Sequence, residues 1–112
     1  MGLDNIWYNR NGEKTYLEFN PELNLVGGLF SEHGNGSFRG GYYNDFFVSV
    51  LGFDLHNDLS NSEVRQIAER LNSMNYDPSF LEEYDITPEE FEDLRRMFTA
   101  YGKAGCHLEA WY

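Results

Sequence analysis

The sequence predicts an α+β fold, in which a small antiparallel sheet packs against three or four helices. Apolar and polar residues alternate near both ends of the chain, and this period of two is typical of strands. Between residues 42 and 102 apolar residues recur every three to four positions, which is typical of helices. Two of these helical stretches also begin with complete capping signals. We therefore expect an N-terminal hairpin and a C-terminal strand to pair in one sheet that the helices cover.

The N-terminal hairpin is expected over residues 3–19. Residues 3–8 are apolar and aromatic, residues 9–12 (Asn-Arg-Asn-Gly) are typical of a turn, and residues 14–19 alternate with Tyr and Leu. Pro21 has no N–H to donate to a ladder, so we expect it to end the second strand.

A glycine-rich loop is expected over residues 24–41, which hold 6 of the 11 glycines. So many glycines disfavour a regular element, but Leu29, Phe30 and Phe38 give the stretch apolar anchors. We therefore expect a packed loop with unusual backbone angles.

Three helices are predicted after this loop. Residues 42–51 carry apolar side chains on one helical face, and Gly52 is a suitable C-terminal stop. Ser60 with Glu63 forms one capping box, and Thr87, followed by Pro88 and Glu90, forms another. The apolar stripes of the three helices are Tyr43, Phe46, Phe47, Val50 and Leu51; Val64, Ile67, Ala68, Leu71 and Met74; and Phe91, Leu94, Met97, Phe98 and Tyr101.

Two shorter elements complete the prediction. Residues 78–84 are expected to form one or two helical turns. Residues 106–112 alternate strictly, with Cys106 on one face of the expected strand and His107 on the other.

Length and charge limit the classes of protein that this chain can belong to. It has 112 residues, and its 8 Lys and Arg against 19 Asp and Glu give a formal net charge of −11. This length fits one domain, residues 1–112, and a hydrophobic content of 41% is too high for a disordered tail. The excess of acids excludes direct binding to nucleic acid, whose phosphates require Lys and Arg.

The same reasoning bears on location. No apolar run approaches the roughly 18 residues of a membrane span, and no basic-then-apolar start indicates a signal peptide. Cys106 is the single cysteine and cannot form an internal disulfide. We therefore expect a protein of a reducing compartment, the cytoplasm, with no membrane contact.

No pattern of residues predicts catalysis. The three histidines, His33, His56 and His107, show no metal-ligand spacing, and Cys106 and His107 face opposite ways on a strand. The segment from Asp54 to Asp58 resembles the start of a calcium loop, but the later ligand positions do not fit. We predict no enzyme, no catalytic residue, no metal and no cofactor.

An acidic segment is the most unusual feature. Eight of the 19 acids lie between residues 77 and 93, where there is no Lys or Arg. A charge run is often only a solvated helix face, but a surface of one sign also steers and selects a partner of opposite charge. We predict a protein partner with a basic surface, contacted by Asp77, Phe80, Glu82, Glu83, Tyr84, Asp85, Glu89, Glu90, Glu92 and Asp93.

The glycine-rich loop, residues 27–41, offers an alternative function. Its backbone amides and polar side chains are suited to a small anionic ligand, which the protein would bind or sequester. The glycines are also explained by the folding of a tight loop alone. The ligand-binding residues of this alternative are Ser31, His33, Asn35, Ser37, Arg39 and Asp45.

The opening residues 1–7 (Met-Gly-Leu-Asp-Asn-Ile-Trp) and the stretch 34–46 resemble small uncharacterised proteins of bacteriophages and bacteria. This resemblance implies a short accessory protein, located in the host cytoplasm if it is phage-encoded. In that context small acidic proteins are often inhibitors that bind host or defence machinery, sometimes by imitating the charge of DNA. The resemblance assigns no functional residue.

Self-association is a further expectation. The chain has 9 Phe, 8 Tyr and 2 Trp, which is a large number for one small core. If an edge of the sheet near the termini is unprotected, two copies can pair across it as a homodimer.

Overall fold

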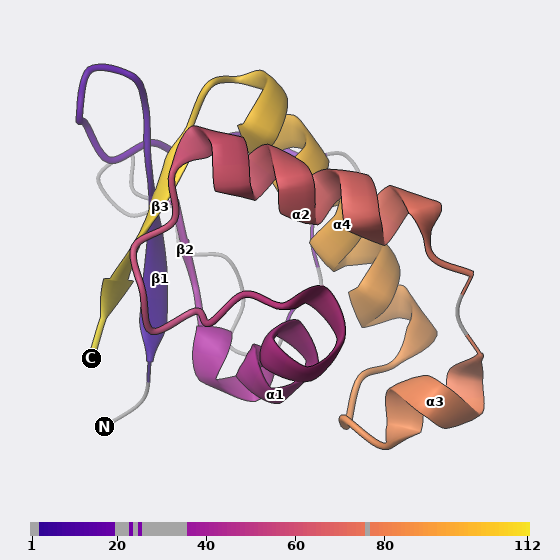
Figure 1. Ribbon diagram of the computed structural model, residues 1–112. Coiled ribbons are helices and arrows are strands. Elements are labelled where there is room, and N and C mark those ends of the chain that lie inside the picture. The colour runs from indigo at the N-terminus through magenta and orange to yellow at the C-terminus, as the bar shows by residue number, and fades with distance from the viewer. Residues whose placement is uncertain (1–2, 20–22, 24, 26–35, 76) are drawn as a thin grey trace.

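The sheet brings the two ends of the chain side by side. The computed structural model describes residues 3–19, 23, 25, 36–75 and 77–112. In this part of the chain, the strands β1 (Asp4–Tyr8), β2 (Gly36–Phe38) and β3 (His107–Trp111) form an antiparallel sheet with the order β2-β1-β3 (Figure 1). β1 pairs with β3 along its whole length, from Asp4 opposite Trp111 to Tyr8 opposite His107. The α+β fold and the pairing of the termini are therefore confirmed.

The predicted second strand of an N-terminal hairpin is wrong. The turn itself forms, since Gly12 has φ 77° and the Asn9 side chain accepts hydrogen bonds from the backbone N–H groups of Asn11 and Glu13. Beyond the turn, residues 14–19 make only a single bridge to β1, between Lys14 and Tyr8. One edge of β1 pairs with β3 along its whole length, and the other edge pairs with β2 at residues 5–7. Residues 14–19 therefore have no free edge of β1 along which to form a longer strand.

The helix predicted over residues 42–51 forms in three short pieces. These are the 3₁₀ turn η2 (Gly40–Tyr42), the α-helical turn α1 (Asn44–Phe46) and the π-helical turn η3 (Phe47–Leu51). The predicted apolar face is buried except for half-buried Val50. Gly52 ends the segment with φ 78°, a left-handed conformation that glycine adopts without strain.

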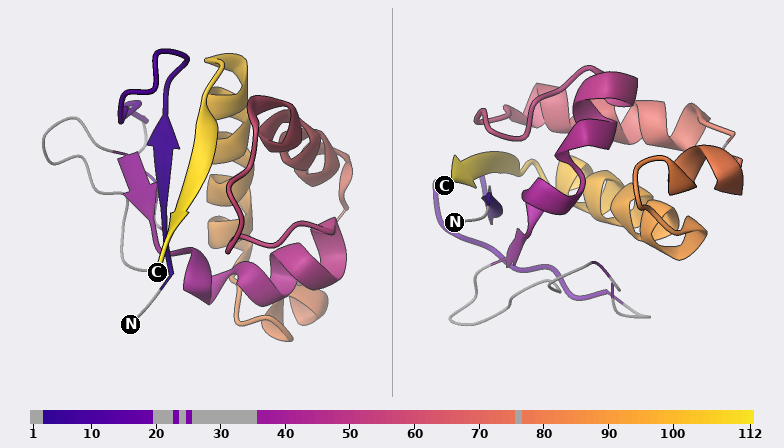
Figure 2. Two further views of the ribbon diagram at one scale, coloured as in Figure 1. Left: turned by 60° about the vertical axis from the view of Figure 1, so that its left-hand side comes forward. Right: turned by 90° about the horizontal axis from the view of Figure 1, so that it is seen from below.

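The other helices begin where the capping signals predict. In α2 (Asn61–Ser73) the Ser60 and Glu63 side chains each accept a hydrogen bond from the other residue's backbone N–H. In α4 (Pro88–Lys103) Thr87 and Glu90 do the same at 3.1 Å. α3 (Pro78–Glu82) is the predicted short helix. Figures 1 and 2 show α2 and α4 packed together beside the sheet.

The core is centred on the indole of Trp7, which is completely buried. Its ring stacks on Tyr101 of α4 with 4.3 Å between centroids and packs edge-on against Phe98 at 5.2 Å. Gly102 keeps α4 close to α2, because a β-carbon there would lie 3.2 Å from Cγ of Arg65. No helix in the described ranges is long and apolar enough for a membrane crossing.

The outer edge of β3 is covered by the segment before α2. Leu59 and Leu108 exchange backbone hydrogen bonds of 2.8 and 2.9 Å, and the Asp58 carboxylate accepts the N–H of Ala110 at 2.9 Å. A covered edge cannot pair with another chain. This edge is therefore not available for the predicted homodimer, and the oligomeric state stays a prediction.

The Asp58 contact can be tested by substitution. Asp58→Ala leaves the Ala110 N–H without its acceptor, and we expect a loss of about 1 kcal/mol in the free energy of unfolding, measured by urea denaturation. Asn57→Ala, a change of the exposed neighbour, is the control and should change stability by less than about 0.5 kcal/mol. Equal stability of the two variants would show that the carboxylate does not protect the edge.

Candidate functional site

Five carboxylates of the predicted acidic segment are exposed around α3 and the start of α4. We call them the acidic surface: Asp77, Glu82, Glu83, Asp85 and Glu89. Their exposure follows from the local fold, because Leu81 and Ile86 are both buried and hold the segment to the core. Asp77 caps α3 by accepting the backbone N–H of Ser79 at 2.9 Å.

Asp85 has an unusual backbone. With φ 57°, it is the only non-glycine residue in the described ranges with a positive φ. It follows α3 in a turn that is closed by the N–H of Ile86, which donates to the carbonyl of Leu81 at 3.1 Å. Glycine or asparagine is the ordinary choice in this conformation, so a charged residue is held here at a small conformational cost.

Two acids of the predicted partner-binding set are buried. Glu90 and Asp93 are only 8% and 7% exposed. The Glu90 carboxylate accepts the Tyr43 hydroxyl at 2.7 Å as well as the backbone N–H of Thr87, so it serves the helix cap and the core. Asp93 pairs with Arg96 at 3.0 Å, and half-buried Glu92 pairs with Arg95. We therefore do not count these three acids as part of the acidic surface.

The two aromatic residues of the predicted set support the surface from below. Phe80 and Tyr84 are half-buried and pack against the core, and their rings meet edge-on with 5.6 Å between centroids. Tyr84 also contacts the buried ring of Phe46 at 5.6 Å. Phe80 and Tyr84 therefore pack between the acidic surface and the core, and their side chains do not project fully into solvent.

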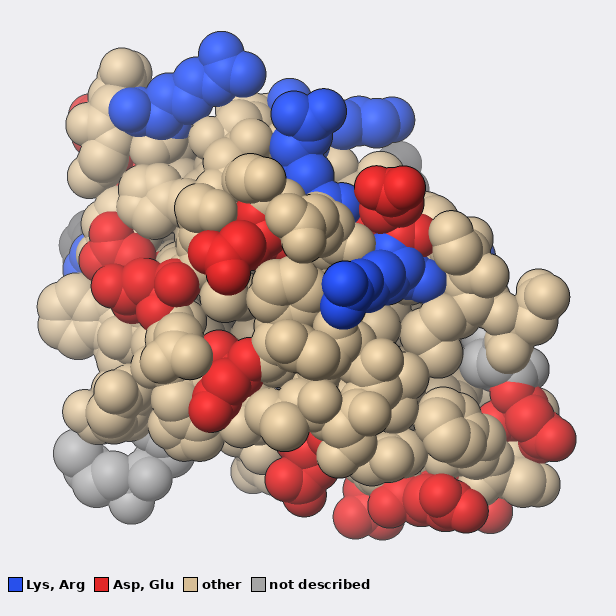
Figure 3. Space-filling model, in the orientation of Figure 1, with Lys and Arg blue, Asp and Glu red and all other residues tan. Residues whose placement is uncertain are grey.

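The charge of the acidic surface is not neutralised from its own segment. Residues 71–94 contain no Lys or Arg. Figure 3 shows a group of acidic side chains at the lower right of the molecule, where Figure 1 draws α3, and no basic side chain beside this group in this view. A one-signed region of this kind produces a local field that attracts basic groups.

A shallow hollow lies within this region. It has a volume of about 310 Å³, and Glu82 and Asp85 border it. Pro78 and Pro88 form part of its walls, and Thr87 and Ile86 complete the lining. The arrangement can receive the end of a Lys or Arg side chain, because the carboxylates accept its hydrogen bonds and the prolines contact its alkyl stem.

The structure gives less support to the alternative in the glycine-rich loop. Ser31, His33 and Asn35 lie outside the described residues, Ser37 belongs to β2, and Asp45 is exposed on α1. Arg39 borders a hollow of about 380 Å³ together with Leu3, Asp4, Gly41 and Tyr42. The carboxylate of Asp4 opposes an anion there, so the geometry favours the acidic surface over this site.

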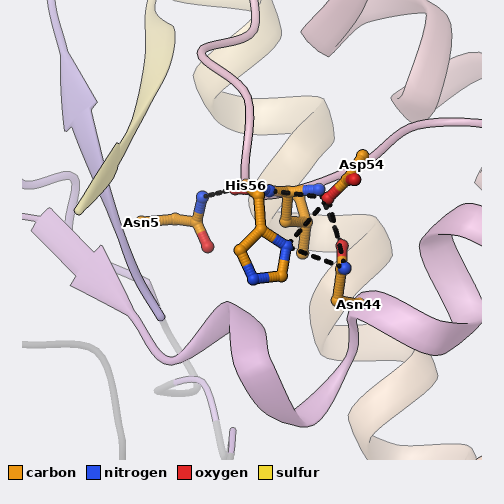
Figure 4. A network of polar contacts seen from close by, with 5 residues as sticks. Asn5, Asn44, Asp54 and His56 are labelled. Carbon is orange, nitrogen blue, oxygen red and sulfur yellow. Dashed lines mark hydrogen bonds and ion pairs between the residues drawn. The ribbon is translucent and has the colours of Figure 1, made fainter. Parts of the chain in front are cut away.

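A polar network around Asp54 was not predicted from the sequence (Figure 4). The Asn44 side chain accepts the N–H of Leu55 at 2.7 Å and donates to Asp54 at 3.2 Å. Oδ1 of Asp54 accepts the backbone N–H of His56 and lies 2.9 Å from Nδ1 of the same residue. The hydrogen bonds from the backbone and then the ring of His56 hold the pKa of Asp54 below its usual value.

Asn5 holds the same loop from the other side. Its side chain is fully buried and donates to the carbonyl of Leu55 at 2.8 Å. A β-carbon at Gly40 would lie 1.8 Å from Oδ1 of Asn5, which explains why a glycine is needed there. The network therefore fixes residues 54–56 to β1 and α1, and we assign it a structural role.

The other reactive groups of the described residues lie apart from one another. Among the described residues, no group of three or more His, Cys, Asp and Glu side chains is placed to hold a metal ion. Cys106 is buried as the alternation predicted, and this burial raises the pKa of its thiol, which disfavours the nucleophilic thiolate. His107 lies on the opposite face of β3, stacked on Tyr8 and 3.0 Å from Glu109.

No protein-family model, curated protein or solved structure matches this chain. The resemblance to phage and bacterial proteins therefore stays a prediction. What the molecule itself offers is the acidic surface and its hollow.

The lowered pKa of Asp54 leads to a prediction about acid stability. A depressed folded-state pKa means that the carboxylate stabilises the fold fully above its unfolded pKa of about 3.9, and that this contribution is lost as pH falls through the folded-state value. Wild type should therefore be more stable than Asp54→Asn near neutral pH, with a difference that shrinks below about pH 4. Urea denaturation at several pH values measures it.

The control for this prediction is Asp45→Asn, which removes an exposed carboxylate of α1 and leaves the network intact. A stability difference for Asp54→Asn that stays constant from neutral to acid pH would contradict the assigned role of the carboxylate.

Proposed function

We propose that this protein is a non-enzymatic binding protein whose acidic surface docks on a basic surface of a partner protein. The observation that carries the proposal is the set of five exposed carboxylates around α3, in a stretch of 24 residues without Lys or Arg. Each like-charge neighbour costs the fold a few tenths of a kcal/mol. A basic partner surface removes this repulsion on binding and is attracted from a distance.

The hollow between α3 and α4 gives the surface a feature that charge alone lacks. Glu82 and Asp85 line the same volume of about 310 Å³ together with Pro78 and Pro88. A Lys or Arg side chain of the partner that enters this hollow is held by charge-assisted hydrogen bonds. The partner is therefore recognised by position as well as by charge.

The natural partner is a protein that binds nucleic acid, since its own binding site must be basic. Occupying that site with carboxylates makes this protein an inhibitor that imitates the charge of DNA. The resemblance to phage proteins supports a host cell as the location of such an inhibitor if it is phage-encoded, and we propose a host or anti-phage defence protein as its target.

Charge reversal tests the proposal. Glu82→Lys together with Glu83→Lys should weaken partner binding at least about tenfold, because attraction at both positions becomes repulsion. The matched control reverses two exposed acids elsewhere, Glu13→Lys and Glu18→Lys, and gives the same net charge. The measurement is affinity capture from a bacterial lysate at low and high salt, followed by titration of the captured protein.

Competition with DNA then identifies the partner's surface. Duplex DNA should displace the captured partner if the acidic surface occupies a nucleic-acid site. Equal binding by both double variants, or capture that no longer depends on salt, would contradict docking through the acidic surface.

A substitution at Asp85 is expected to change stability and partner binding in opposite directions. Asp85→Asn keeps the shape of the side chain, suits the positive φ better and removes one like charge, so we expect the fold to gain about 0.5 kcal/mol. The same change removes one acceptor from the hollow and should weaken partner binding several-fold. Thermal denaturation and titration measure the two effects. A variant that is less stable or that binds more tightly would contradict this account.

A further inference from the structure

In the described part of the chain, no helix covers the outer face of the sheet. Trp7 of β1 and Leu108 of β3 are completely buried in the core, so the alternate residues of both strands point the other way. Figure 2 (left) shows β1 and β3 turned toward the viewer, with the helices behind or beside them. We call this side of the two strands the outer face; its residues are Asp4, Ile6, Tyr8, His107, Glu109 and Trp111.

The aromatic side chains of the outer face pack on one another. The rings of Tyr8 and His107 stack with 5.5 Å between centroids. Trp111 is 51% exposed, and the ammonium group of Lys14 lies 5.4 Å from the centroid of its ring. Half-buried Ile6 lies between these two groups along β1. The outer face is therefore a largely aromatic area that stays in contact with water.

The exposure of Trp111 is the most unusual feature of this face. Trp111 and the adjacent Tyr112 are two of the four large apolar side chains that are exposed in the described ranges. Tryptophan is strongly enriched among the residues that dominate protein interfaces, because burying its ring removes a large apolar area from water. The outer face is therefore suited to contact with a second protein surface.

The charge of the outer face changes sign along the strands. At one end, the turn after β1 carries two bases and one acid, Arg10, Lys14 and Glu13. Arg10 lies close to the start of β3, since a β-carbon at Gly105 would be 2.1 Å from its Nε. At the other end of the face lies Asp4, which is exposed. One end is therefore positive and the other negative.

The acids between the two ends have partners within the chain. Glu109 lies 3.0 Å from Nε2 of His107, and the Asp58 carboxylate at the edge of β3 accepts the N–H of Ala110. These contacts leave the two ends of the face as its main electrostatic feature.

A second copy of this chain matches such a face. In a two-fold symmetric dimer the same surface is used by both copies. A two-fold axis that crosses the strands near their middle sets the turn end of one copy against the Asp4 end of the other. Lys14 of each copy then meets Asp4 of the second copy, so the attraction occurs twice. A partner of uniform charge would be repelled at one of the two ends.

We infer that the outer face is the interface of a homodimer, in which two sheets pack face to face with this charge pairing and with Trp111 buried. Figure 1 draws α3 on the far side of the molecule from the sheet, so the acidic surfaces of the two copies stay apart. A strand of five residues is only about 17 Å long. The interface is therefore small, and we expect a weak dimer with a dissociation constant of about 100 µM.

Sedimentation equilibrium of the full chain, from about 10 µM to about 1 mM, tests the inference. Trp111→Glu puts a charge into the interface and should weaken dimerisation at least about tenfold. Val48→Glu is the matched control, because Val48 is 48% exposed, lies on η3 and gives the same net charge. This control should dimerise like the wild type.

Charge reversal tests the pairing of the two ends. Lys14→Glu and Asp4→Lys should each weaken self-association, because like charges then meet across the two-fold axis. An equimolar mixture of these two variants should associate as strongly as the wild type, since each opposed pair in the mixed dimer again has opposite charges.

NMR spectra of the wild type locate the interface without any substitution, and they keep the test valid if Trp111→Glu fails to fold. The amide signals of residues 4–8 and 107–111 should shift as the protein concentration rises. A monomer up to about 1 mM would overturn the inference and leave the outer face to a different partner. Equal weakening by Val48→Glu, shifts confined to other residues, or a mixture that associates no better than its components would overturn it as well.

Discussion

The stacking of Trp7 on Tyr101 is the contact on which the rest of the molecule depends. It joins the central strand, near its C-terminal end, to the fourth turn of α4 through two large, fully buried rings with parallel planes. The Tyr101 hydroxyl also accepts the backbone N–H of Leu17 at 3.0 Å, so the same side chain holds the segment that follows the N-terminal turn. Strand, helix and loop therefore share one fixed point, and α4 cannot shift without disturbing the sheet.

The position of α4 in turn places the charges at its two ends. Glu89 is exposed in its first turn, and Lys103 ends its last. This order agrees with the helix dipole, which favours acids at the N-terminus and bases at the C-terminus. The preferences of a single helix thus account for part of the charge separation. Asp85 lies before α4 and is not explained by its dipole, and it belongs to the acidic surface on which the proposed function depends.

Local signals in the sequence were sufficient for the helices. The capping boxes at Ser60 and Thr87 and the apolar stripes after them involve residues within one or two turns of each other, so no long-range information was needed. The sheet was harder. Leu17 and Phe19 alternate with polar residues because they pack against the core and not because they pair in a strand. β2 lies at the end of a glycine-rich run whose composition argued against any regular element.

The candidate site was predictable in its charge but not in its detail. The concentration of acids was visible, and the burial of Glu90 could have been inferred, because it shares a helix face with Leu94, Met97 and Tyr101. The capping box also indicates that the Glu90 side chain turns back toward the start of the helix. No local signal indicated that Asn5 reaches the carbonyl of Leu55, since this contact joins residues 50 positions apart. The hydrogen bond from Asn72 of α2 to Thr99 of α4 likewise joins residues 27 positions apart.

The net charge of −11 is unevenly distributed over the molecule. In the middle of α4, Glu92 pairs with Arg95 and Asp93 pairs with Arg96, so these four charges compensate one another. The five carboxylates of the acidic surface have no Lys or Arg in their own stretch, residues 71–94. Glu89 and Lys103 lie at opposite ends of α4, about 21 Å apart along its axis, whereas charges in physiological salt are screened within about 8 Å. The field at the acidic surface is therefore set almost entirely by its own carboxylates.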